Sequence, residues 1–284
     1  MPRPVQITSL SNPRLKQVTR LREHRHRRKT GLLIAEGHRE VSRALAAGLR
    51  IRELWTSPEL LTSRTRPDEL ASLLAAAPDD ALHAEVPAKL FRKIAYVREP
   101  EGLLAVAEQP HWSVADLPPV GDDTLYLVAV GVAKPGNLGA MVRSADAAGC
   151  QAVFAAGTPV DAFNPNAIRT STGAVFSVPV LAMSESEARE HLEAAGVRLA
   201  LATLRDATPH TQFDWRGPVA IVIGPEDLGL SDAWYAERAA GVAGEVAGEV
   251  AGVKVAMRGR TVDSLNASNA AAVLLFEALR QRAG

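Results

Sequence analysis

Three polar stretches in the second half of the chain hold the residue types best suited to chemistry. The first runs from Asn137 to Arg143, the second carries Glu226 in a glycine-rich turn, and the third delivers Ser264 and Asn266 into the start of a helix. The first amides of a helix have no partner within the helix, so they favour anions and electron-rich edges of a ligand. These stretches are therefore candidates for a ligand site.

The same residues also have a purely structural interpretation. Ser264 and Asn266 are common helix caps and turn formers. Arg143 has Asp146 three residues later, at the spacing of a helical ion pair, and Glu226 could be an exposed turn carboxylate. Neither the dinucleotide pattern G-x-G-x-x-G nor the phosphate loop G-x-x-x-x-G-K-[ST] is present. Each stretch taken alone is weak evidence of function.

Apolar runs indicate the elements that must position these residues. We expect strands at residues 125–130, 152–155, 178–181, 197–202, 219–223 and 253–257. Such continuous Val, Ala and Leu runs, separated by helical segments, favour a parallel sheet covered on both faces, which binds ligands at the carboxyl ends of its strands. Glycine and polar residues gather at those ends, at 131–139, Thr203, 224–231 and 258–266.

The first 107 residues predict a separate small α/β domain. A helix is expected to begin near Asn12, and strands are expected at 31–35, 51–55 and 100–107. Further helices are predicted from 36–40 and from Ser57, which is followed by proline. Residues 108–123 lose this periodicity and contain three prolines and a glycine, which indicates a linker. Residues 124–284 would then form the second domain.

Composition narrows the class of protein. The 284 residues carry 32 basic and 32 acidic side chains, and no apolar run is long enough to cross a bilayer. Without a signal-peptide pattern either, we expect a cytoplasmic protein with no membrane contact. Its one cysteine, Cys150, is expected to be a buried structural thiol. No Cys/His group has metal-ligand spacing, so no metal is expected.

The charge is unevenly distributed. Residues 14–29 contain eight basic residues against Glu23 alone: Arg14, Lys16, Arg20, Arg22, Arg25, Arg27, Arg28 and Lys29. Such clustering is typical of a surface that binds nucleic-acid phosphates, and the alternative is a solvated helical face. A tandem Val-Ala-Gly-Glu repeat at 240–253 is expected to be a loop or a frayed helix without chemistry.

Taken in order and at their spacing, the three polar stretches closely resemble the motifs of the SpoU (TrmH-like) RNA ribose 2′-O-methyltransferases of the SPOUT class. The likeness continues through Asn164-Pro165, residues 169–174 and Pro179. The N-terminal half is similar to the family's substrate-binding domain at 7–9, 12–13, 36–37 and 101–105. Within the family, the whole chain is similar to the avilamycin-resistance type of large-subunit rRNA methyltransferase. Ala256 departs from the family's usual proline.

The resemblance implies a homodimer that uses S-adenosylmethionine in a deep trefoil knot and modifies RNA, with a uridine of 23S rRNA as the expected target. Donor contacts are expected at Thr203, Leu204, Ile223, Gly224, Val255, Ser264 and Leu265. The implied catalytic residues are Asn137, Arg143, Glu226, Ser264 and Asn266, with Arg143 of one protomer meeting the donor of the other. Expected RNA contacts are Arg14, Arg22, Arg25, Arg27, Arg28, Lys29 and Arg169.

The role of Arg143 stays open at this stage. The family's proposed base is the matching arginine, but a guanidinium remains protonated at neutral pH. Arg143 could instead hold a phosphate and stabilise developing alkoxide charge. Three other functions are also possible: a tRNA ribose methyltransferase, a catalytically silent RNA-binding assembly factor, and a nucleotide-dependent metabolic enzyme, although this last has no phosphate-binding signature here.

Overall fold

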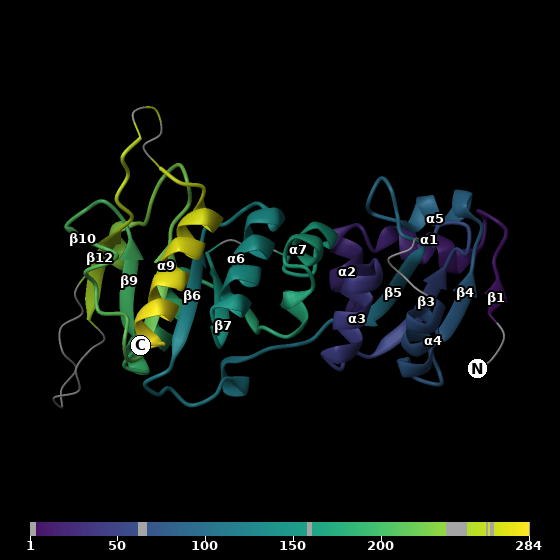
Figure 1. Cartoon of the computed structure of the whole chain (residues 1–284), viewed down its shortest axis with the longest axis horizontal. Coiled ribbons are helices and arrows are strands. Elements are labelled where there is room, and N and C mark those ends of the chain that lie inside the picture. Colours follow the sequence, from purple (N-terminus) through teal and green to yellow (C-terminus); the bar gives the residue numbers. More distant parts are fainter. Residues whose placement is uncertain are drawn as a thin grey trace. The chain divides into compact units, whose positions relative to one another are not determined.

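The computed structural model describes residues 4–61, 67–157, 161–236, 249–259, 261 and 264–283. The chain forms two compact units (Figure 1). The N-terminal unit comprises Met1–His111 together with Phe163–Ser177, and the C-terminal unit comprises Trp112–Ala162 together with Val178–Gly284.

The N-terminal unit is built on a five-stranded sheet with the order β1-β4-β3-β5-β2. The strands are β1 (Val5–Gln6), β2 (Leu32–Glu36), β3 (Ile51–Thr56), β4 (Leu82–Glu85) and β5 (Leu103–Glu108). β5 runs antiparallel to both β2 and β3. The three strands expected here are confirmed to within a few residues. β1 and β4 were not predicted, because they are short and carry polar residues.

Five helices are described in the first part of this unit: α1 (Pro13–Arg20), α2 (His24–Thr30), α3 (His38–Ala46), α4 (Pro67–Ala76) and α5 (Ala88–Ile94). α1 begins as predicted, because the Asn12 side chain accepts the Arg14 backbone N–H at 2.9 Å. The helix expected from Ser57 is wrong. The Ser57 carbonyl closes one turn onto Leu60 and Leu61, and the Ser57 N–H donates to Gly102, so the segment is tied to β5.

A segment from between two strands of the other sheet also belongs to the N-terminal unit. It holds α7 (Pro165–Thr170) and the 3-10 turn η2 (Ala174–Phe176). α7 packs against β2, and Arg43 of α3 donates to the Thr172 carbonyl at 2.6 Å. The expected division into 1–107 and 124–284 instead leaves this segment in the second domain.

The C-terminal unit contains a seven-stranded sheet in which all the paired strands run parallel. Its order is β10-β12-β9-β11-β6-β7-β8. The strands are β6 (Leu125–Val130), β7 (Ala152–Ala156), β8 (Val180–Met183), β9 (Arg198–Ala202), β10 (Ala207–Pro209), β11 (Val219–Ile223) and β12 (Val250–Lys254). β6 and β11 have the bounds that the sequence predicted, and the parallel sheet is confirmed.

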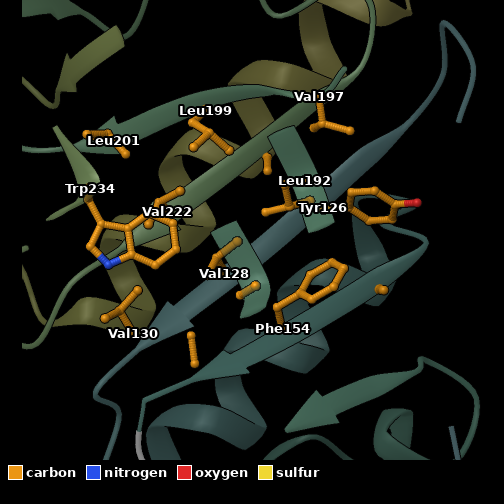
Figure 2. Packing of buried hydrophobic residues seen from close by; sticks show 14 of the residues in the cluster. Tyr126, Val128, Val130, Phe154, Leu192, Val197, Leu199, Leu201, Val222 and Trp234 are labelled. Carbon is orange, nitrogen blue, oxygen red and sulfur yellow. The ribbon is translucent and has the colours of Figure 1, made fainter. Parts of the chain in front are cut away.

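Both faces of this sheet are covered. On one face, α8 (Glu185–Ala194) and the 3-10 turn η3 (Asp232–Trp234) bury a cluster that includes Tyr126, Phe154 and Trp234 (Figure 2). Helices α6 (Pro135–Ala147) and α9 (Ala267–Arg282) pack against each other beside β6 and β11 (Figure 1). The inward face of α6 is fully buried at Leu138, Met141, Val142 and Ala145.

β12 lies between β9 and β10, although β9 and β10 follow each other directly in the chain. Gly252 allows this close approach, because a Cβ there would lie 2.7 Å from the Arg205 carbonyl oxygen. The strand expected at 253–257 was placed three residues too late. The end of the repeat, which was expected to be a loop or frayed helix, is therefore strand at 250–253, and residues 240–248 lie outside the described part.

Two further expectations concern the chain as a whole. Cys150 is buried, and burial raises the pKa of its thiol to about 12, as expected for a structural thiol. Within the described ranges, the helices are too short or too polar to span a bilayer.

Candidate functional site

A cavity of about 470 Å³ lies in the C-terminal unit, where β9, β11 and β12 end. Its walls include all seven residues expected to contact a donor: Thr203, Leu204, Ile223, Gly224, Val255, Ser264 and Leu265. They come from three separate stretches of the chain. Parallel strands bring these stretches together because their carboxyl ends meet at one edge of the sheet.

Gly224 fixes the shape of one wall. A Cβ at this position would lie 2.9 Å from the Gly229 carbonyl carbon and the Leu230 amide nitrogen. Gly229 itself has a φ of 66°, in the left-handed region that favours glycine. The turn between them folds back tightly after β11, and this turn carries Glu226 to the edge of the cavity.

The Glu226 carboxylate connects the three polar stretches. Its Oε1 accepts the side-chain amide of Asn137 at 3.1 Å, the side-chain amide of Asn266, and the backbone N–H of Ala267 at 3.2 Å. Asn266 in turn caps α9, because its Oδ1 accepts the Ser268 N–H at 3.0 Å. A carboxylate at a helix start is favoured by the helix dipole. The helix cap Asn266 and the candidate catalytic residue Glu226 are thus held together by hydrogen bonds.

Arg205 and Tyr235 also line this cavity, and the sequence analysis did not identify them. The Tyr235 hydroxyl donates to Thr203 Oγ1 at 2.7 Å, and the Arg205 guanidinium lies 4.6 Å from the centre of the Tyr235 ring. Arg205 also pairs with Asp232 at 2.9 Å. The cluster fixes the segment after β9 against η3. No sequence pattern pointed to it, because the partners lie about thirty residues apart and follow no common spacing.

Arg143 does not reach this cavity within its own chain. It is exposed on α6, six residues after Asn137, which is about 9 Å along the helix axis. Among the described residues it forms no hydrogen bond or ion pair, and the ion pair with Asp146 that the structural interpretation required is not formed there. The other four implied catalytic residues, Asn137, Glu226, Ser264 and Asn266, lie at or beside the cavity.

The expected RNA contacts divide into two groups. Arg14, Arg25, Arg28, Lys29 and Arg169 are exposed. Arg27 is 1% exposed and donates to the Leu21 carbonyl at 2.6 Å. Arg22 is half-buried and donates to the carbonyls of Lys93 and Ala95, which closes the end of α5.

This placement corrects two of the expected RNA contacts. The guanidinium of Arg27 is occupied inside the fold, and that of Arg22 satisfies helix-end carbonyls. Counting charges in the sequence could not separate these two from the exposed arginines, because only the tertiary contacts distinguish them.

Two family models match separate parts of the chain. The SpoU rRNA Methylase family matches residues 124–276, and the MRM3-like substrate binding domain matches residues 12–105. Among curated proteins, the chain is 31% identical to the 23S rRNA (uridine(2479)-2′-O)-methyltransferase of Streptomyces viridochromogenes. That alignment covers 97% of this chain and 92% of the relative.

Solved structures resemble the whole chain. The crystal structure of an RNA 2′-O ribose methyltransferase is similar with a TM-score of 0.83 and 39% identity, and the match covers 99% of this chain and 100% of the other. The AdoMet-bound rRNA methyltransferase from Sinorhizobium meliloti has a TM-score of 0.80 and 29% identity, and the match covers 97% of both chains.

Proposed function

Because this chain belongs to the SpoU rRNA methylase family, we propose that its substrate is a uridine of 23S ribosomal RNA. The enzyme transfers a methyl group from S-adenosylmethionine to a ribose 2′-hydroxyl of RNA. The observation that carries this assignment is the convergence of all seven expected donor contacts on one cavity beside the Glu226 carboxylate.

The cavity fits the donor. Its volume of about 470 Å³ lies within the range of about 300 to 1,000 Å³ found for small-molecule sites. Apolar side chains such as Ile223 and Leu265 line it together with polar Thr203 and Ser264. These residues would hold S-adenosylmethionine, which supplies an electrophilic methyl group on its sulfonium.

We propose that Glu226 acts by positioning. Because its Oε1 already accepts three hydrogen bonds, the carboxylate holds Asn137, Asn266 and the start of α9 in one arrangement. The two asparagines then orient the substrate ribose at the edge of the donor cavity. Holding reacting groups in line contributes up to about 7 to 11 kcal/mol in ideal cases.

Arg143 enters the proposal as a residue supplied by a second copy of the chain. It lies outside the cavity of its own chain and has no ion-pair partner among the described residues, so its charge is available to another protomer. The exposed apolar side chains of Val273 and Phe276 on α9 support a homodimer, because they lack cover within the chain. The partner's arginine would bind substrate phosphate or stabilise the alkoxide.

We extend the proposal to the architecture and the biological setting. Residues 1–107 together with Phe163–Ser177 bind RNA, 108–123 connect the units, and the remainder of 124–284 carries out transfer. The position of β12 between β9 and β10 supports a trefoil knot. Methylation of a 23S rRNA uridine in the cytoplasm would change a surface that ribosome-targeting antibiotics bind, and so confer resistance.

Labelled donor and separate pools of ribosomal and transfer RNA test this function. We expect label in 23S rRNA alone, and mapping should place it on a uridine ribose. Label in transfer RNA alone would overturn the assigned target. Donor binding without transfer to any RNA would favour the catalytically silent assembly factor.

A further inference from the structure

Tyr96 is an exposed aromatic side chain in the N-terminal unit. It lies just after α5 and exposes 42% of its surface, whereas Trp55 and Phe91 of the same unit are buried. A tyrosine that contributes little to the core is free to contact a ligand. Its ring offers a flat face, which suits another planar group.

A buried carboxylate fixes the backbone at this tyrosine. Glu36, at the end of β2, accepts the backbone N–H groups of Tyr96 at 2.6 Å and Val97 at 3.2 Å through Oε2. Its Oε1 is buried and has no hydrogen-bond partner within the described part of the chain. Burial raises the pKa of Glu36 to about 7.

This arrangement is costly for the fold. A carboxylate with one unpaired buried oxygen destabilises a protein, and such exceptions to ordinary packing concentrate at functional sites. The two amides it binds belong to Tyr96 and to the next residue. The buried Glu36 carboxylate therefore has one local effect: it fixes the position of the loop that presents Tyr96.

Exposed basic residues lie close to the tyrosine in the chain, and one from α7 shares a cavity with it. Arg92 and Lys93 lie in the last turn of α5, Arg98 follows in the loop, and Arg169 of α7 lines a small cavity together with Tyr96. An aromatic platform among cations is the combination that binds single-stranded nucleic acid, because bases stack on the ring while the cations contact phosphates.

We infer that Tyr96 stacks on one unpaired nucleobase of the substrate RNA. The base must be unpaired and displaced from its neighbours, because the faces of bases within a duplex are already covered by stacking. This inference rests on the proposed function for the presence of RNA. It adds a base-binding position in the N-terminal unit, apart from the methyl-transfer cavity. Glu36 is its positioning residue.

The test compares Tyr96→Ala and Tyr96→Phe with the wild type in binding a short single-stranded oligouridylate and an RNA duplex of equal length. Tyr96→Ala should bind the single strand roughly 5- to 150-fold more weakly, the effect of losing one stacked base. Tyr96→Phe keeps the ring and should bind like the wild type. Duplex affinity should not change. Leu10→Ala, which removes another exposed side chain of this unit, is the matched control.

The salt dependence separates stacking from collapse of the loop. Stacking involves no ion pair, so Tyr96→Ala should lower affinity at every salt concentration without changing the slope. A reduced slope together with weaker duplex binding would mean that the mutation displaced the basic residues, and would overturn the inference. Unchanged single-strand affinity of Tyr96→Ala would overturn it as well.

Methylation of 23S rRNA by the wild type, measured on the same preparation, distinguishes failure of the stacking inference from failure of the proposed function. A wild type that methylates while Tyr96→Ala binds normally retains the proposed function and loses only the stacking position. A wild type that transfers no methyl group to any RNA contradicts the proposed function itself.

Discussion

Glu226, Asn137 and Asn266 are polar side chains with a joint role that no one of them has alone. Two amides and a helix N–H converge on a single carboxylate oxygen, so the position of each side chain depends on the other two. Arg143 stands apart from this group on α6. It is therefore the residue whose replacement tests chemistry with the least disturbance of the fold.

Arg143→Ala is predicted to lower methyl transfer by about a hundredfold or more, the effect of losing one donor that stabilises transition-state charge. Donor affinity and oligomeric state should stay as in the wild type, because the buried face of α6 is untouched. Single-turnover transfer at saturating RNA measures the effect, and Arg216→Ala, which removes an exposed arginine paired with Asp214, is the control. Near-normal transfer by Arg143→Ala would contradict the role assigned to this residue.

Arg143→Lys distinguishes the two roles. Lysine keeps the charge and loses its proton more readily, but it cannot bind a phosphate in a forked geometry. A rate that recovers as pH rises would favour the base, and inactivity at every pH would favour bidentate positioning.

Glu36→Gln is predicted to make the stability of the N-terminal unit less dependent on pH. Burial and Glu40 raise the pKa of Glu36 from 4.5 to about 7, while the backbone amides and Arg22 oppose the shift. The pKa of Glu36 is higher in the folded protein than in the unfolded chain. Its contribution to stability is therefore fully present below pH 4.5 and is lost as pH rises through 7. Glutamine does not ionise, so it removes this loss.

Urea unfolding at pH 5 and pH 8 measures the effect, with Glu99→Gln as the exposed control. Relative to the wild type, Glu36→Gln should gain stability at the higher pH. An equal change in both proteins between the two pH values would mean that Glu36 does not titrate in this range.

At the scale of elements, α2 is a helix with two different faces. Arg25, Arg28 and Lys29 point to solvent, whereas Arg27 lies inside the unit and binds the Leu21 carbonyl. The basic run is thus both a surface and a part of the packing. A separate set of substitutions can therefore test each of these two roles.

Replacing Arg25, Arg28 and Lys29 together by alanine is predicted to weaken RNA binding and to reduce its salt slope, because up to three phosphate contacts are lost. Donor binding should not change. Arg27→Ala should instead lower the free energy of unfolding, because the Leu21 carbonyl loses a buried partner. Filter binding across a salt series and thermal unfolding measure the two effects. Unchanged affinity and slope in the triple variant would show that this face is only solvated.

At the scale of the molecule, a homodimer is predicted, with each active site built from two chains. Light scattering at micromolar concentration should give twice the mass of the 284-residue chain, and a mass of one chain would contradict the prediction. The exposed Phe276 and Val273 of α9 are the apolar residues expected to be covered.

Complementation tests whether the site is shared. Gly224→Val should block donor binding, because a Cβ there meets the backbone at 2.9 Å. Co-expressed Arg143→Ala and Gly224→Val chains should recover about a quarter of wild-type activity, since half of the randomly formed dimers are mixed and each holds one intact site. No recovery would mean that Arg143 acts within its own chain.

The sequence by itself determined the parallel sheet, most strand positions and which stretches meet at the cavity. The short, continuous apolar runs of β6 and β11 suit buried strands of a parallel sheet, and ligands bind such sheets where the strands end. The motif resemblance pointed to Thr203, Gly224 and Ser264, which line one cavity. Local patterns suffice to predict these features because each strand or motif is encoded by residues that are neighbours in the chain.

Only the tertiary structure decided which charged groups serve the fold and which face solvent. The guanidinium of Arg27 is buried and donates to the Leu21 carbonyl. The carboxylate of Glu36 accepts the backbone N–H of Tyr96, sixty residues away. Likewise, Phe163–Ser177 joins the other unit, and Gly252 allows β12 to pass close to Arg205. Burial and hydrogen bonding depend on residues far apart in the chain, so no local period or spacing encodes them.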